Sequence, residues 1–143
     1  MEEDLDLYPA WKQLLKVAKT WDYGSVHKHD EVSAIISEKH KTLKYYNAVG
    51  RANIELADMG RFLINLKSVG YMVVNPDEYP EAVLSLTNAV YRKMKRVVRV
   101  VEGAPVELMT SESVGKIRTM SDRAKTALAM VKSTRKDYIN LLK

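Results

Sequence analysis

The chain of 143 residues is 46% hydrophobic and 29% charged, and it contains no cysteine. This length suits one domain, or one small domain with a helical appendage, and the composition is too apolar for a disordered chain. The lack of cysteine excludes disulfides, thiolate metal sites and cysteine nucleophiles. No apolar run approaches the roughly 20 residues that cross a bilayer, and no signal-peptide core is present, so we expect a cytoplasmic protein that does not enter a membrane.

The formal charge of +5 is unevenly distributed along the chain. Residues 1–75 carry ten basic and ten acidic side chains, whereas residues 76–143 carry thirteen basic and eight acidic ones. Four acids of the first part lie within residues 2–6, so the remainder of that part is net positive. A basic balance with a pI of about 9.3 favours a polyanionic partner without identifying one.

The first predicted elements are two helices. Apolar residues recur at helical spacing from Pro9 to Thr20, and proline suits a first helical turn. The residues from Trp21 to Gly24 interrupt this period, and Ser25-Val26 is either a short strand or the lead into the next element. A short second helix is expected to begin near His29 or Asp30. Its expected buried residues are Val32, Ile35 and Ile36.

A third helix is expected from about Leu43 to Met59, closed by Gly60. Its apolar positions recur every three or four residues, and they are Tyr45, Ala48, Val49, Ala52, Leu56 and Met59. The opposite face is polar, and its members are Lys44, Asn47, Arg51, Glu55 and Asp58. Side chains on that face are free to meet water or DNA.

The following segment changes to an alternating pattern, which predicts a two-stranded β-ribbon. Its strands are expected at residues 62–67 and 71–74, with the loop Ser68-Val69-Gly70 between them and Asn75-Pro76 after them. Three helices followed by a hairpin give the order of a winged helix-turn-helix. We therefore predict a mainly α fold with a small β-hairpin, in a winged-helix domain that spans residues 8–76.

Residues 77–143 are expected to add two long helices. The first has an apolar seam and ends at Gly103-Ala104-Pro105, and the second runs from about Ser111 to Leu142 with Thr110 or Ser111 as its cap. The residues of the first seam are Val83, Leu86, Val90, Val97 and Val101. The two helices are expected to form an antiparallel pair, which either folds back on the first domain or forms a homodimer with another subunit.

The ribbon Leu63-Ile64-Asn65-Leu66-Lys67-Ser68-Val69-Gly70-Tyr71-Met72-Val73 resembles the wing of OmpR-type and PhoB-type effector domains, which belong to the winged-helix family. In that family, an apolar strand, a basic residue and a tight turn lead into Gly-Tyr and the last strand. The resemblance covers Pro9 to Val74 and implies DNA binding. It implies that Lys67 lies near phosphate, that Gly70 is the turn glycine, and that Tyr71 lies at the wing base. Ser68 stands where the family has a glycine.

Nine side chains are candidates for contact with nucleic acid. Asn47 and Arg51 lie four residues apart, hence on one helix face, and both can make paired hydrogen bonds to base edges. Lys41 and Lys44 are placed for phosphates near the start of the same helix, and Lys67 is placed on the ribbon. The fourth helix adds a basic stripe that consists of Arg92, Lys95, Arg96 and Arg99. A weaker cluster consists of Lys132, Arg135 and Lys136. The alternatives are a solvated face or, for the stripe, ion pairs with acids of the last helix.

These observations predict a non-enzymatic protein that binds double-stranded DNA, either a phage or a bacterial regulator or a replication-type factor. The alternative is a phage-encoded module that binds a host enzyme and inhibits or redirects it. Glu55 and Asp58 favour this alternative, because acids on the exposed helix face repel phosphate. A single-stranded nucleic acid would require an exposed aromatic platform that the sequence does not suggest.

No enzyme, cofactor or metal is expected from the motifs of the chain. The sequence contains no nucleophile elbow, phosphate-binding glycine loop or dinucleotide fingerprint. The three histidines, His27, His29 and His40, lack the spacing of metal ligands, and we expect surface or capping roles for them.

Overall fold

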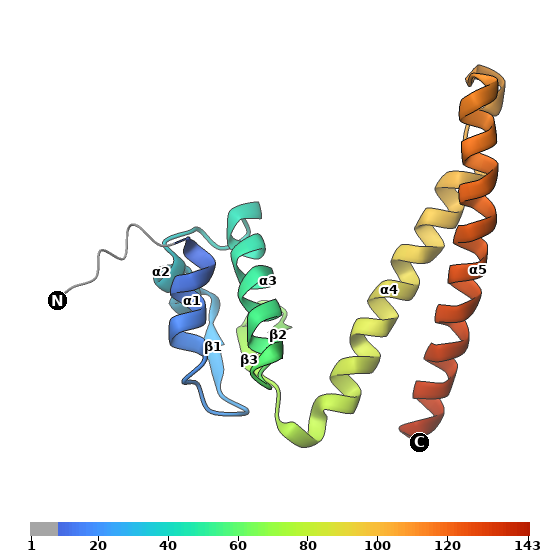
Figure 1. Ribbon diagram of the computed structural model, residues 1–143. Helices are drawn as coiled ribbons and strands as arrows, with labels where there is room; N and C mark the ends of the chain where they lie inside the picture. Colours follow the sequence, from blue (N-terminus) through green and yellow to red (C-terminus); the bar gives the residue numbers. More distant parts are fainter. Residues whose placement is uncertain (1–8) are drawn as a thin grey trace. The chain divides into compact units, whose positions relative to one another are not determined.

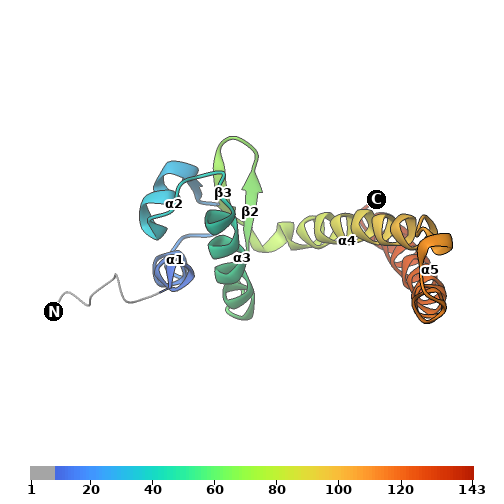
Figure 2. The same cartoon turned by 90° about the horizontal axis from the view of Figure 1, so that it is seen from above.

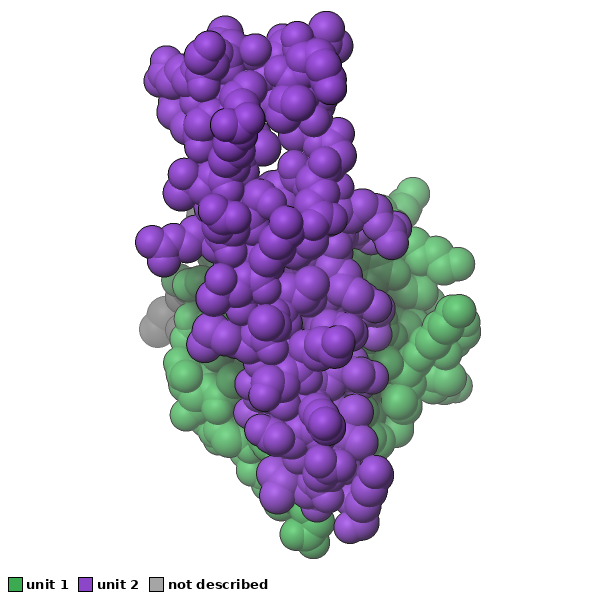
Figure 3. Space-filling model, turned by 90° about the vertical axis from the view of Figure 1, so that its right-hand side faces the viewer, with its two compact units in different colours: residues 1–79 green, residues 80–143 purple. Residues whose placement is uncertain are grey.

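A computed structural model describes residues 9–143, which form five α-helices and one three-stranded antiparallel sheet (Figure 1). The chain divides into two compact units, residues 1–79 and residues 80–143, here called the N-terminal unit and the hairpin unit (Figure 3). The boundary expected from the sequence lies between residues 76 and 77. The acids within residues 2–6 and the expected domain start at residue 8 lie outside the described residues.

The N-terminal unit contains helices α1 (Ala10–Ala18), α2 (His29–Ile36) and α3 (Leu43–Asp58). All three were predicted from apolar spacing. The hydroxyl of Thr42 caps α3 by accepting a hydrogen bond from the backbone N–H of Tyr45 at 3.3 Å. Gly60 follows α3 with a φ of 75°, a conformation that a glycine adopts without strain.

The sheet consists of β1 (Val26–Lys28), β2 (Leu63–Leu66) and β3 (Gly70–Val73), in the order β1-β3-β2. The predicted β-hairpin consists of β2 and β3. For Ser25-Val26 the sequence allowed either a short strand or a connection to the next helix, and Val26 is found in strand β1. Seen from above, the β-hairpin of β2 and β3 lies beside α3 (Figure 2). Asn53 of α3 fixes this position, because its amide donates to the carbonyl of Leu63 and accepts from the N–H of Leu63, both at 2.8 Å.

Gly70 does not act as a turn glycine, contrary to the resemblance. The residue with positive φ in the turn is Ser68, at 64°. Gly70 begins β3 opposite Lys28 of β1, and a Cβ there would lie 2.0 Å from the carbonyl oxygen of His27. The glycine is therefore required by the close approach of the third strand, which the sequence analysis did not place.

One hydrophobic core joins the helices and the sheet of the N-terminal unit. Its fully buried large side chains include Leu14, Val32, Tyr45, Leu56 and Val73, one or more from each helix and one from β3. Met59, which was expected on the same face, is half exposed because it lies beyond the last turn that meets the core.

His29 contradicts the expectation of a surface histidine. Its side chain is buried, stacks on the ring of His40 at a centroid distance of 3.8 Å, and places Nδ1 2.9 Å from the Tyr45 hydroxyl. Burial, followed by the charge of His40, lowers the pKa of His29, and Asp30 opposes this shift. Burial and then Tyr46 raise the pKa of Tyr71 to about 12. This aromatic cluster connects α2, α3 and β3.

The hairpin unit consists of α4 (Tyr79–Glu102, whose first residue belongs to the N-terminal unit) and α5 (Ser111–Leu141). A short 3-10 turn at Val106–Leu108 lies between the two helices, and another at Pro76–Glu78 precedes α4. Thr110 caps α5 by accepting from the N–H of Ser113 at 3.2 Å. The helices run antiparallel, since Glu102 pairs with Lys125 at 3.2 Å while Arg135 Nε donates to Asn88 Oδ1 at 2.6 Å.

The seam predicted for α4 is wrong at four of its five residues. The less exposed side chains of α4 include Leu84, Tyr91, Met94, Val98 and Val101, which recur at heptad spacing and form the side toward α5. Four of the five predicted seam residues are instead exposed, and they are Val83, Leu86, Val90 and Val97. Apolar residues occupy two neighbouring faces of this helix, so periodicity alone had two solutions.

Candidate nucleic-acid interface

Helix α3 is buried along one face and open to solvent along the other. The candidate residues Lys44, Asn47 and Arg51 are all exposed on it, as the sequence predicted. The core side chains Tyr45, Ala52 and Leu56 lie on the opposite face. The helix is therefore presented outward by the rest of the N-terminal unit.

Arg51 is held against its own protein. Its guanidinium lies 5.1 Å from the centre of the Trp11 ring of α1, and one of its nitrogens lies 3.5 Å from a carboxylate oxygen of Glu55. The cation–π contact contributes on the order of 0.5–1 kcal/mol at an exposed position. Arg51 must leave both partners before it can contact a base. Asn47 has no such contact to break among the described residues.

The line of α3 that points most directly away from the core is largely apolar. Leu43, Asn47, Gly50 and Ile54 recur at intervals of four, three and four residues, and Leu43 and Ile54 are 75% and 59% exposed. Tyr46 lies beside this line and is also exposed. Sequence reasoning missed these residues because it sorted α3 by polarity, although the helical period alone would have aligned them.

Gly50 lies within α3 where a side chain would have room. A Cβ at this position would meet no atom within 4 Å, and no positive φ is present. Glycine in a helix interior costs about 1 kcal/mol relative to alanine. Nothing inside the described chain accounts for the glycine, so the outward face of α3 is open to the close approach of another molecule.

The two remaining candidates of the N-terminal unit lie in its loops. Lys41 is exposed two residues before α3 with a φ of 68°, and Lys67 is exposed in the β2–β3 turn. The last strand pair is Leu66 with Gly70, so only residues 67–69 extend beyond the sheet. The turn is tied to α2, because the N–H of His29 donates to the carbonyl of Val69 at 3.2 Å. The ribbon is short, and its tip is anchored.

A polar hollow of about 390 Å³ lies where this turn meets the start of α2. Its lining includes Lys28 and Asp30 from the N-terminal end of α2, His40 from the joint between α2 and α3, and Ser68 from the turn. The charges of Lys28 and Asp30 are opposite, so the hollow has no clear preference for an anion.

In the hairpin unit, the predicted basic stripe is exposed along α4. Within the described residues, none of Arg92, Lys95, Arg96 and Arg99 pairs with a carboxylate, so the expected alternative of ion pairs with α5 does not account for the stripe. Lys95 lies 4.7 Å from the centre of the Tyr91 ring. Residues 80–143 carry thirteen basic and six acidic side chains, which leaves the stripe in a strongly positive surrounding.

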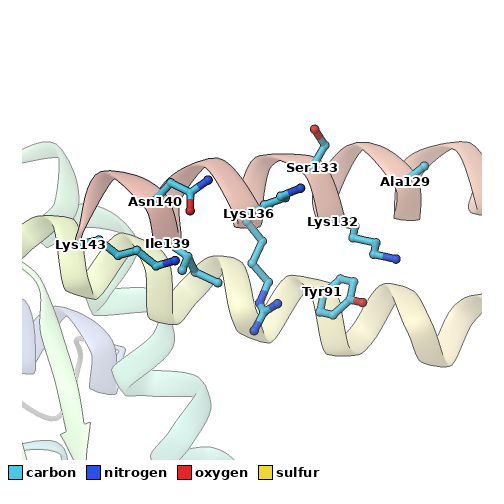
Figure 4. Close-up of a pocket in the computed structure, with 9 residues that line it drawn as sticks. Tyr91, Ala129, Lys132, Ser133, Lys136, Ile139, Asn140 and Lys143 are labelled. Atoms are coloured by element: carbon cyan, nitrogen blue, oxygen red, sulfur yellow. The ribbon is translucent and has the colours of Figure 1, made fainter.

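The weaker basic cluster forms one wall of an open groove of about 570 Å³ between α4 and α5 (Figure 4). Lys132, Arg135, Lys136 and Lys143 line it from the α5 side, and Tyr91 lines it from α4. Arg135 lies 5.2 Å from the Tyr91 ring centre, so it is held by both Tyr91 and Asn88. These four cations therefore line one groove, whereas the sequence placed three of them only near one another along α5.

Comparisons with protein-family models, with curated proteins and with solved structures gave no match to this chain. Among residues 9–143, no helix combines the length and the apolar character that crossing a membrane requires. The same residues contain no group of three or more histidine and acidic side chains arranged to hold a metal ion.

Proposed function

We propose that the chain binds double-stranded DNA and that its N-terminal unit is a winged helix-turn-helix. The observation that carries this proposal is the order α1-β1-α2-α3-β2-β3, combined with a sheet in the order β1-β3-β2 and with an α3 that is exposed along one face. In such modules the third helix enters the major groove and the ribbon lies near the backbone.

The contacts follow from the positions of the side chains. Lys41 and Lys44 meet phosphates at the N-terminal end of α3, and Asn47 reaches a base edge from its exposed line. Arg51 joins them after leaving Trp11 and Glu55. Lys67, at the tip of the anchored turn, meets the adjacent backbone.

The hairpin unit adds sequence-independent attraction. The stripe of Arg92, Lys95, Arg96 and Arg99 contacts phosphates, each of which adds about 0.9 to the slope of binding against salt. A small basic protein of this kind fits a phage or bacterial regulator or replication-type factor in the bacterial cytoplasm.

A shift assay on random duplex at 50 mM and at 200 mM salt tests the proposal. We expect affinity to fall by about a hundredfold or more between the two conditions. Lys44→Ala and Asn47→Ala should each weaken binding at low salt, whereas Lys19→Ala, which removes an exposed charge just after α1, should not. Binding that is equally sensitive to all three variants, or absent at 50 mM salt, would contradict the proposal.

One observation favours a second function, the binding of a host enzyme by a phage-encoded module. The outward line of α3 exposes Leu43 and Ile54 with Tyr46 beside them, and Asp58 lies near its end. Exposed apolar side chains of this kind suit a protein partner better than a phosphate backbone. Recovery of a stoichiometric protein after nuclease treatment, lost in Ile54→Glu but retained in Lys44→Ala, would decide for this function.

A further inference from the structure

Helix α4 carries a second apolar stripe that α5 leaves open. Val83, Leu86, Val90, Val97 and Val100 are between 43% and 65% exposed. With Lys93 they recur at intervals of three, four, three, four and three residues, the spacing of a coiled-coil seam. We call these six residues the outer stripe. It lies beside the face that meets α5.

The hairpin unit buries very little by itself. Ala124, at 8% exposure, is its one buried residue among those described, and α4 contains none. Helices in water derive most of their stability from the packing of an apolar face, and two helices with so little buried surface are marginal. The outer stripe is thus a surface whose burial would complete the unit.

We propose that the outer stripe packs against the outer stripe of a second copy of this chain, with the two α4 helices antiparallel. The intervals of three, four, three, four and three residues favour this arrangement, because they are the same when counted from either end of the stripe. Antiparallel packing places Val83 against the partner's Val100, Leu86 against the partner's Val97, and Val90 against the partner's Lys93. Every apolar member of the stripe then meets either another apolar side chain or the aliphatic stem of the lysine.

The flank of the outer stripe that faces away from α5 also fits a second copy. Ala82 and Ala89 occupy two of its positions, and small side chains there let two helices approach closely. Arg96 occupies the next position of the same line, and Arg92 and Arg99 of the basic stripe lie one line further from the outer stripe.

Lys93 sets the register and limits the affinity. A single charged residue within a seam specifies alignment at a cost in stability. In the antiparallel register, the two copies of Lys93 lie close to the twofold axis, so their charges repel. High salt should therefore strengthen this association, whereas it weakens DNA binding. The inference does not depend on DNA binding, and opposite salt responses distinguish failure of one from failure of the other.

The first test is the mass of the full chain in solution without DNA. At about 50 µM we expect twice the chain mass of 16.3 kDa. Val90→Glu combined with Val97→Glu should give the monomer mass. The matched control Leu108→Glu, at an exposed residue of the turn that connects α4 to α5, should keep the dimer. A monomeric wild type, or a dimer that survives the double variant, overturns the proposal.

A second test uses a variant that should dimerise more tightly, because unfolding of a variant cannot produce a gain of affinity. Lys93→Leu removes the central charge and should lower the dimer dissociation constant by about tenfold or more. An unchanged or higher constant in Lys93→Leu overturns the proposal.

Thiol cross-linking tests the orientation, and the absence of native cysteine makes it clean. A mixture of Val83→Cys and Val100→Cys chains should cross-link to each other, whereas neither variant alone should do so. Cross-linking of each variant to itself would mean parallel helices and would overturn the antiparallel arrangement.

Discussion

The two units of this protein are stabilised in different ways. In the N-terminal unit, three helices and a sheet bury side chains such as Leu14, Val32 and Tyr45 in one core, and Asn53 ties the sheet to α3. In the hairpin unit, two long helices share a seam of half-buried residues and present cations to solvent. The first unit therefore has a core that defines its shape, whereas the second leaves an apolar stripe of α4 exposed.

The largest expected effect separates the two units by their cores. Leu56→Ala should lower the free energy of unfolding of the N-terminal unit by about 3 kcal/mol, because it leaves a cavity among fully buried neighbours. Val98→Ala in the half-buried seam of α4 should cost about 1 kcal/mol or less. Both tryptophans, Trp11 and Trp21, lie in the N-terminal unit, so their fluorescence in urea follows that unit, while circular dichroism follows both. Equal losses in the two variants would refute the contrast.

The next effect concerns the clamp between α3 and the ribbon. Asn53→Ala leaves both backbone groups of Leu63 without their partner, so we expect a loss of about 2 kcal/mol in urea unfolding. Asn47→Ala is the matched control on the same helix, since it should weaken DNA binding and leave stability within about 0.5 kcal/mol. A clamp variant as stable as the control would show that the two hydrogen bonds do not hold the ribbon in place.

A smaller effect should follow pH through His29. Burial lowers the pKa of His29, so the unfolded chain takes up a proton at higher pH than the folded chain. Stability should therefore be full above the model-peptide pKa of about 6.5 and should decline as pH falls toward the lower folded value. The groups around His29 are His40, Asp30, Tyr45 and Tyr71. Urea midpoints at pH 7.5 and 5.5 measure this decline, and His29→Gln should reduce it. If the wild type and His29→Gln show the same pH dependence, the decline in stability comes from other groups.

The smallest effect tests the open face of α3. Gly50→Ala should raise the free energy of unfolding by about 0.5–1 kcal/mol, because alanine favours the helix and the space is empty. If another molecule approaches the backbone at Gly50, the same variant should bind duplex more weakly. Thermal melting and the shift assay give the two readings. A more stable protein with unchanged binding would show that the contact surface lies elsewhere.

The fold of the N-terminal unit was largely predictable because a single core selects one apolar face in each element. The apolar face predicted for α3 carries six residues at helical spacing, more than its outward line with Leu43 and Ile54. The alternating segment after Gly60 predicted the ribbon but not its buried face, because the alternation groups Phe62 with Ile64, whereas the structure buries Leu63. Pairing of β1 with β3 was beyond local patterns, since it joins residues more than 40 positions apart. The same long-range contact explains why Gly70 was misread as a turn residue.

The hairpin unit and the details of the interface were less predictable for a related reason. Helix α4 has apolar residues on two adjacent faces, and only the approach of α5 selects Leu84 and Tyr91 over Val83 and Val90. The contact of Arg51 with Trp11 likewise depends on how α1 lies against α3. Polarity identified Asn47, but the exposure of Leu43 and Ile54 follows only from their position opposite the core.

Contact between the outward line of α3 and duplex DNA, as proposed above, can be measured through the protection of a single thiol on that line. With Asn47→Cys in this cysteine-free chain, excess duplex at low salt should slow thiol alkylation by about tenfold or more, and 500 mM salt should remove the protection. Lys19→Cys, just after α1, should react at the same rate with and without duplex. Unprotected alkylation at position 47 under conditions in which the duplex is fully bound would contradict the account.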